Sequence, residues 1–325
     1  MFGPSFNFLF FSSRKLAGDN LIGYCNSKGT QSEDSFYGSL DISIKDGGPN
    51  DFCTQVDVQN EQHIMAGIRK TFPNHGIIGE EEASSNDKTI QVPSLWVSAI
   101  ETSTTDKSNN NNTNNQSSVP PPTWVIDPID GTTNFASGLG ITCVSIALCD
   151  TIQGCPQQRP VVGVIYAPMT RELYLAVRGY GAFRNGQKII NRRRDHNKQP
   201  KPVQQAIICC EMGYPRNADA ISKMVGALER ILLRQCRAIR QLGSGCLDLC
   251  YVATGRLDVV YAGVATEGWK PWDYAAGLVI CQEAGCVMES IDQKSGENFD
   301  LYSKSIICAE SRELLEEIRT IITFK

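Results

Sequence analysis

The chain has 325 residues, of which 41% are hydrophobic and 20% are charged, and its formal net charge is -4. This composition is typical of a globular protein, and the length allows one broad domain or two packed halves. The weakly acidic balance excludes a general electrostatic attraction to nucleic acid or anionic membranes, and no apolar run approaches the length that spans a bilayer.

The sequence contains thirteen cysteines, and no two of them form a C-x-x-C pair. Six lie in apolar periodic segments, where a free cysteine packs as a small hydrophobic side chain: Cys209, Cys210, Cys246, Cys250, Cys281 and Cys286. This usage predicts buried thiols in a reducing compartment, and we expect a cytoplasmic protein. A weak organelle transit peptide is the alternative, because the first 18 residues lack acids and carry Arg14 and Lys15.

The N-terminal segment, residues 1–40, is poorly defined by its sequence, and only residues 13–24 faintly resemble an amphipathic helix. Alternation then predicts a short strand at residues 41–45. The next predicted element is a helix over residues 58–72, and Asp57 stands at its start as an N-cap would. The residues that set its helical spacing and its end are Ile64, Ile68, Phe72 and Pro73.

Residues 77–78 predict the end of a strand, which a glycine and three consecutive acids follow. A run of acids most often marks a solvated helix or loop face. The preceding strand makes Glu80 the better candidate for a metal ligand, since a strand end holds a side chain rigidly. Glu81 is a secondary candidate, and Glu82 is expected at the surface.

Two stretches lack a regular pattern. Residues 83–122 contain an asparagine-rich tract followed by three prolines, which predicts a low-complexity insertion without fixed structure. The basic run at residues 192–194 resembles a nucleic-acid patch, but no aromatic residues are interleaved. We therefore interpret it as a solvated connector between two halves of the protein.

The most informative stretch is residues 124–135, WVIDPIDGTTNF. A short apolar strand leads to Asp127 and Asp130, and the proline between them fixes a bend. The carbonyl of Ile129 and the free amides near Gly131 and Thr132 add to this set. Paired carboxylates, a carbonyl and free amides suit a hard cation that bridges to a phosphate. The alternative is an ordinary Asp-Pro/Asp-Gly surface turn.

The pattern of the remaining chain predicts strands first and then alternating strands and helices, which indicates a layered α/β sandwich. We expect an N-terminal half at residues 41–190 that carries the metal motifs and a C-terminal half at residues 203–325 that completes the site. Strands are predicted at 141–148, 161–166, 172–177, 206–210, 238–242, 257–262, 286–291 and 305–309, a hairpin turn at Asn185-Gly186, and helices at 219–236, from 243–245 to 255, 272–284 and 311–323.

Three motifs together resemble the inositol monophosphatase family, whose members are Mg²⁺-dependent, commonly lithium-inhibited phosphomonoesterases. They are WVIDPIDGTTNF at residues 124–135, WDYAAGLVICQEAG at 272–285 and IIGEEE at 77–82. Their order matches the family, and the resemblance covers roughly residues 41–323. It implies the sugar-phosphatase fold, with helix and sheet layers alternating and the site between the halves. It also implies a homodimer, and a role in inositol phosphate metabolism and phosphatidylinositol biosynthesis.

The resemblance implies two to three Mg²⁺ ions. Glu80, Asp127 and the Ile129 carbonyl match the ligands of a first ion, and Asp127, Asp130 and Asp273 match those of a second. A weaker third ion is implied near Glu80. For Asp273, an ordinary helix cap is the alternative role.

The resemblance also implies the chemistry. A water activated by the metal attacks phosphorus in line, and it is oriented by Glu80 and by the pair Asp57 and Thr132. No covalent intermediate on the enzyme is expected. The residues matched to substrate contacts are Asp130, Gly131, Thr132, Ser244 and Glu267.

The sequence departs from the family pattern near the substrate pocket, which leaves the substrate open. The segment from Glu267 to Asp273 is one residue shorter than in the animal enzymes, and Lys270 adds a charge there. Gly245 and Cys286 replace a frequent alanine and a usual glycine. A 3'(2'),5'-bisphosphate nucleotidase and phosphatases of galactose 1-phosphate or histidinol phosphate are the enzyme alternatives, and an inactive homologue acting as a scaffold is the alternative from another class.

Overall fold

The computed structural model describes residues 42–45, 52–85, 121–152, 155–190, 201–266, 268–293 and 298–323. The expectations for the N-terminal segment, for residues 86–120 of the insertion, for the basic run and for Glu267 lie outside these ranges. Among the described residues, no helix is long and apolar enough to cross a bilayer.

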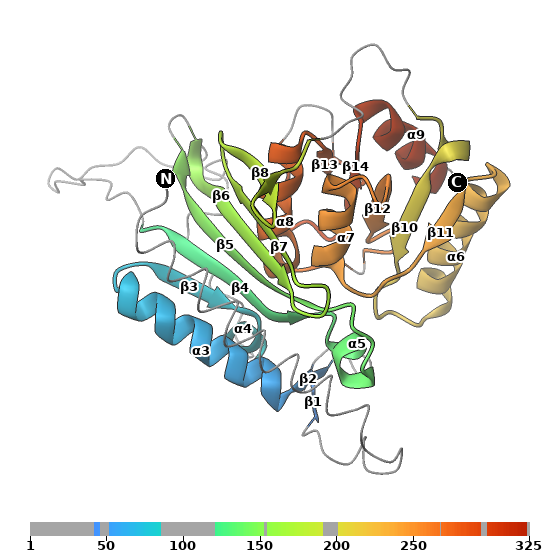
Figure 1. The fold of residues 1–325 in the computed structure, drawn as a ribbon. Helices are drawn as coiled ribbons and strands as arrows, with labels where there is room; N and C mark the ends of the chain where they lie inside the picture. Colours follow the sequence, from blue (N-terminus) through green and yellow to red (C-terminus); the bar gives the residue numbers. More distant parts are fainter. Residues whose placement is uncertain are drawn as a thin grey trace, which may run out of the picture.

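Helices and sheets alternate in layers, as Figure 1 shows. The larger sheet has the order β3-β4-β5-β6-β7-β8-β9, in which β3 and β4 are parallel and the other neighbours are antiparallel. Its strands are β3 (Gly76–Gly79), β4 (Thr123–Asp130), β5 (Cys143–Ile152), β6 (Cys155–Ala167), β7 (Glu172–Val177), β8 (Gly181–Arg184) and β9 (Gln187–Lys188). The predicted turn at Asn185-Gly186 joins the last two strands.

The smaller sheet has the order β11-β10-β12-β14-β13. Its first three strands are parallel, and β14 pairs antiparallel with both neighbours. Its strands are β10 (Ile207–Glu211), β11 (Ala238–Arg240), β12 (Val259–Ala262), β13 (Val287–Glu289) and β14 (Ile306–Ala309). Two short strands outside both sheets, β1 (Ile42–Ile44) and β2 (Phe52–Thr54), form a separate antiparallel pair.

Three helix layers enclose the sheets. Helices α7 (Gly245–Ala253) and α8 (Pro271–Ala284) lie between the two sheets, and α6 (Ala218–Leu233) and α9 (Arg312–Thr323) cover the outer face of the smaller sheet. The outer face of the larger sheet is covered by α3 (Gln55–Thr71), with α4 (Glu80–Ser85) and α5 (Thr132–Ser137) near one end. The predicted layered α/β sandwich is therefore confirmed.

The central core joins the halves. One cluster of buried side chains runs from the larger sheet through α7 and α8 to the smaller sheet, with Tyr174, Leu249, Ile280 and Cys308 among its members. A Cβ at Gly163 of β6 would lie 2.4 Å from the carbonyl oxygen of Ala276, so α8 packs directly on the sheet backbone. The division into halves at residues 41–190 and 203–325 stays a prediction.

The start of α3 corrects the prediction for Asp57. Thr54 is the N-cap, and its side chain accepts the N–H of Val56, while Asp57 is the third residue of the helix. The Asp57 carboxylate accepts the N–H of Thr54 at 2.8 Å and completes a capping box. The helix therefore begins at Gln55, three residues before the predicted start at residue 58, because its N-cap is Thr54 and not Asp57.

Candidate active site

Asp127 and Asp130 lie at the end of β4, and both are buried. Residues three apart on a regular strand point to opposite faces of a sheet. Here the pairing register with β5 shifts between the two acids. This irregularity re-aims the strand end, and a carboxylate oxygen of each acid lies in one cluster with Asp273, all within 4.8 Å of one another.

Asp273 reaches the cluster from the first turn of α8, where Pro271 is the first helical residue and Lys270 the N-cap. Its Oδ2 accepts the N–H of Lys270 at 2.6 Å. The carboxylate thus caps the helix and also faces the two acids of β4, so the two roles considered for it coexist. Gly285, which adopts the left-handed conformation with φ 89, ends this helix after Ala284, where the sequence predicts its end.

The carboxylate oxygens of this cluster are suited to bind a divalent cation. Asp127 Oδ1 is buried and has no hydrogen-bond partner within the described ranges. Burial first, and then the charges of Glu80 and Asp130, hold the pKa of Asp127 well above its usual range. The pKa of Asp273 is raised in the same way. Ionised carboxylates this close repel one another, and a hard cation with oxygen ligands removes that cost.

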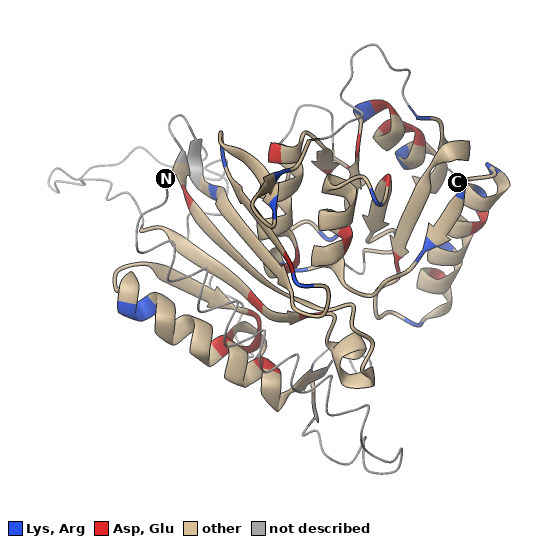
Figure 2. Cartoon of the chain, in the orientation of Figure 1, with Lys and Arg blue, Asp and Glu red and all other residues tan. Residues whose placement is uncertain are grey.

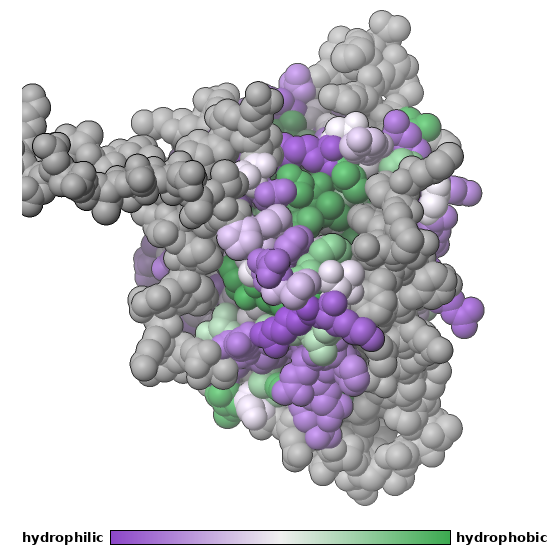
Figure 3. Space-filling view, turned by 90° about the vertical axis from the view of Figure 1, so that its left-hand side faces the viewer, coloured by the Kyte–Doolittle hydropathy of each residue, from purple (hydrophilic) through white to green (hydrophobic). Residues whose placement is uncertain are grey.

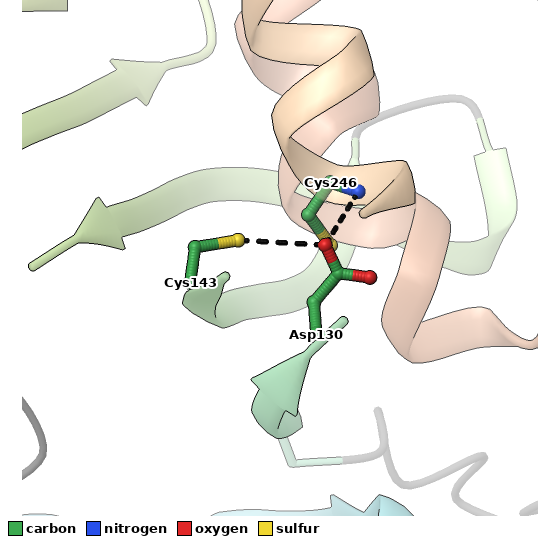
Figure 4. Close-up of side chains that lie close together, drawn as sticks. All are labelled: Asp130, Cys143 and Cys246. Atoms are coloured by element: carbon green, nitrogen blue, oxygen red, sulfur yellow. Dashed lines mark hydrogen bonds between the residues drawn. The ribbon is translucent and has the colours of Figure 1, made fainter. Parts of the chain in front are cut away.

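Oδ2 of Asp130 joins β4 to the start of α7 (Figure 4). It accepts the hydroxyl of Ser244, the N–H of Cys246 at 3.0 Å and the thiol of Cys143 at 3.5 Å. Burial raises the pKa of Asp130 to about 6, and these donors oppose the rise. Ser244 therefore lies beside the acid cluster, where its predicted role as a substrate contact requires it.

Glu80 is the first residue of α4, directly after β3. The ammonium of Lys45 lies 2.8 Å from a carboxylate oxygen of Glu80 and equally close to one of Glu81. Glu80 also borders Asp127, since each carboxylate affects the pKa of the other. Burial raises the pKa of Glu80, and Lys45 opposes the rise. Glu82 is exposed, as expected.

Asp57 and Thr132 meet across two elements. The Thr132 hydroxyl lies 3.4 Å from Asp57 Oδ1 and 3.1 Å from the carbonyl oxygen of Ile129. Burial raises the pKa of Asp57 to about 7. Gly131 precedes Thr132 with φ 85, a left-handed conformation that turns the chain sharply after Asp130.

Glu61 also supports this region, and sequence reasoning missed it. Its carboxylate accepts the N–H groups of Glu81 and Glu82, both at 2.8 Å, and so holds the first turn of α4. Burial raises the pKa of Glu61 to about 7. Helical spacing was a usable signal, since Glu61 falls on the buried face of α3 that also carries Asp57 and Ile64.

Acidic residues gather around α4 and the ends of the neighbouring elements, as the red segments in Figure 2 show. The structure thus brings together all the predicted site residues that it describes, from β4, α3, α4, α5, α7 and α8. On the face in Figure 3, hydrophobic patches of the described residues are separated by hydrophilic ones. The homodimer stays a prediction.

Comparison of the sequence with known proteins identifies its family. The model of the inositol monophosphatase family matches residues 13–324. Inositol monophosphatase 2 of Solanum lycopersicum is 35% identical over 271 residues, which cover 83% of this chain and 84% of that protein. The Nus factor SuhB of Pasteurella multocida is 33% identical over 278 residues and covers 84% of this chain and 85% of its own.

Solved structures of similar proteins superpose on this chain. The SuhB protein of Bartonella henselae superposes with a TM-score of 0.70 at 26% identity, covering 99% of both chains. An IMPase of Thermotoga maritima superposes with a TM-score of 0.65, also at 26% identity, and covers 98% of this chain and 96% of its own.

Proposed function

The chain belongs to the inositol monophosphatase family of phosphatases, and on that premise we propose that it hydrolyses myo-inositol monophosphate, or a closely similar sugar phosphate, with Mg²⁺ as its cofactor. The single observation that carries the proposal is the meeting of Asp127, Asp130 and Asp273 within 4.8 Å. The buried Oδ1 of Asp127, which has no hydrogen-bond partner in the part of the chain that the structure describes, supports it, because a buried carboxylate oxygen needs a donor or a cation.

The same residues suit the binding of the cofactor. Glu80, Asp127 and the Ile129 carbonyl would hold one ion, and Asp127, Asp130 and Asp273 a second. Bound Mg²⁺ neutralises the charge of a phosphate monoester and lowers the pKa of water. The Lys45 ammonium, 2.8 Å from Glu80, favours the ionised form of that carboxylate and holds it in place.

The residues of the chain then orient the reactants. A Thr132 hydroxyl that donates to Asp57 leaves its lone pairs free to accept a hydrogen bond from the attacking water. The amides of Gly131 and Thr132 are proposed to hold phosphate oxygens. Ser244 donates to Asp130, and its lone pairs can accept a polyol hydroxyl. Glu267 is kept as a proposed contact from the sequence alone.

The test measures phosphate release by the purified full chain, with and without Mg²⁺. The substrates are myo-inositol 1-phosphate, galactose 1-phosphate, histidinol phosphate and adenosine 3',5'-bisphosphate. We expect release to require Mg²⁺ and to be fastest from the inositol ester. Fastest release from the adenosine ester would identify a nucleotidase instead. Failure with all four esters would favour an inactive homologue that acts as a scaffold.

A further inference from the structure

We propose that Cys143, Cys246 and Asp130 form a binding site for a thiophilic divalent cation such as Zn²⁺ or Cd²⁺, and that this cation competes with Mg²⁺ for Asp130. The binding itself is independent of the reaction. Only the competition rests on the proposed function.

The three donors converge from separate elements onto one point (Figure 4). The sulfur of Cys143, the sulfur of Cys246 and a carboxylate oxygen of Asp130 all lie within 4.8 Å of one another. Cys143 Sγ is 3.5 Å from Asp130 Oδ2. A tetrahedral zinc ion with ordinary Zn–S and Zn–O bonds places its sulfur and oxygen ligands about 3.6 Å apart. The resting geometry therefore needs little change to bind the ion.

A fourth ligand atom is also in place. The Ser244 hydroxyl contacts Asp130 Oδ2 and lies 3.9 Å from Cys143 Sγ. Two thiolates, a carboxylate and a hydroxyl or water form a donor set that suits zinc and cadmium better than magnesium, because soft sulfur ligands select thiophilic ions.

The site is rigid and buried. Cys143 is the first residue of β5 and pairs directly with Asp130 of β4, while Cys246 lies in the first turn of α7. The exposed fractions are 0% for both cysteines and 6% for Asp130. Cysteine binds a metal ion as the thiolate, so binding of the ion forms two metal–sulfur bonds and releases the two thiol protons to solvent.

A second cluster provides an internal competitor for the ion. Ligand atoms of Cys209, Glu211 and Asp248 also lie within 4.8 Å of one another. It offers one sulfur rather than two, so the proposal predicts that a thiophilic ion prefers the pair beside Asp130.

The experiment titrates the full chain with Cd²⁺ in the presence of Mg²⁺ and follows the ultraviolet charge-transfer absorption of cadmium thiolate. We expect Cys143→Ala and Cys246→Ala each to weaken Cd²⁺ binding by about tenfold or more. Cys149→Ala is the matched control, since Cys149 is buried on the same strand. It should bind Cd²⁺ as the unchanged chain does. Loss of the band in Cys209→Ala alone, or its persistence in both site variants, would overturn the proposal.

A measurement on the unchanged chain covers the case in which the variants fail to fold. The anomalous scattering of Cd²⁺ in crystals locates the ion directly. Density between the two sulfurs supports the proposal, and density confined to Asp127 and Asp273 without sulfur ligands contradicts it. Inhibition of phosphate release by Zn²⁺ that decreases as Mg²⁺ rises would then establish the competition.

Discussion

Two largely buried acidic clusters contact the turn around Ser244, and they differ in how their charge can be neutralised. The first comprises Asp127, Asp130 and Asp273, and the second comprises Cys209, Glu211 and Asp248.

In the second cluster, Glu211 is well supplied with donors. Its Oε1 accepts the N–H groups of Leu242 at 2.7 Å and Gly243 at 3.0 Å. Asp248 is fully buried, and neither of its oxygens has a donor among the described residues. Burial, and then the charge of Glu211, holds the pKa of Asp248 well above its usual range. A single proton on Asp248, donated to Glu211, satisfies this pair.

One proton cannot satisfy the first cluster, because it brings three carboxylates together and a fourth, Glu80, affects the pKa of two of them. The comparison teaches that burial of acids does not by itself indicate a metal site. The number of converging carboxylates distinguishes a cation site from a protonated pair.

The sharpest way to break this comparison is a pair of isosteric substitutions. Asp127→Asn should lower the rate of phosphate release by about 10²-fold or more, because it removes a negative charge from the cluster that binds the cation. Asp248→Asn should retain most of the activity, because an amide donates to Glu211 as the protonated acid does. Steady-state kinetics on myo-inositol 1-phosphate measures both. Equal losses in the two variants would contradict the distinction.

Mg²⁺ should stabilise the folded chain, and more so at pH 8 than at pH 6. The first cluster has carboxyl pKa values raised in the fold. Its contribution to the free energy of unfolding without metal is therefore largest below the unfolded pKa of Asp and is lost as pH rises through the folded values. Mg²⁺ at about 100 times its Kd would add ~2.7 kcal/mol at the higher pH.

Thermal unfolding with Mg²⁺ or EDTA at the two pH values checks this. The Asp127→Asn variant is the control and should show a smaller stabilisation. A shift in Tm that is the same at both pH values would count against a cation bound by ionising carboxylates.

Gly131→Ala tests the close packing of the chain after β4 against the turn at Gly243. The residue has φ 85, and an added Cβ would lie 2.9 Å from the carbonyl oxygen of Ile141 and 3.0 Å from that of Gly243. Gly186 has φ 78 but open space around its Cβ position, which makes Gly186→Ala the matched control. Conformational strain costs about 1–2 kcal/mol in both variants. Urea unfolding should show a larger loss for Gly131→Ala, and phosphate release should fall only in that variant.

The smallest effect is expected for the stability of Asp248→Asn. The folded pKa of Asp248 is raised, so its contribution to stability is greatest below its unfolded pKa and decreases as pH rises toward the folded value. Asn does not titrate. The variant should therefore gain stability relative to the unchanged chain between pH 6 and pH 9, which urea unfolding at the two pH values measures. A pH-independent difference would mean that Asp248 is already ionised.

Local patterns predicted much of the fold. Apolar alternation and helical spacing predicted strands such as β7 and helices such as α8, because a half-buried element shows its exposed face in its own sequence. The β4 motif likewise indicated a phosphate and metal site, since strand, acids and glycine are contiguous in the chain. The start of α3 was missed because its cap, Thr54, lies outside the apolar repeat.

The sequence by itself determined which residues are candidates for the chemistry, but tertiary structure decided which of them meet. Asp130 contacts Ser244 across 114 residues, and Lys45 contacts Glu80 across 35. Neither the register shift after Asp127 nor the two thiols beside Asp130 leaves a periodic signal. Such contacts depend on how sheets and helices pack over long sequence separations, and local propensity does not record that packing.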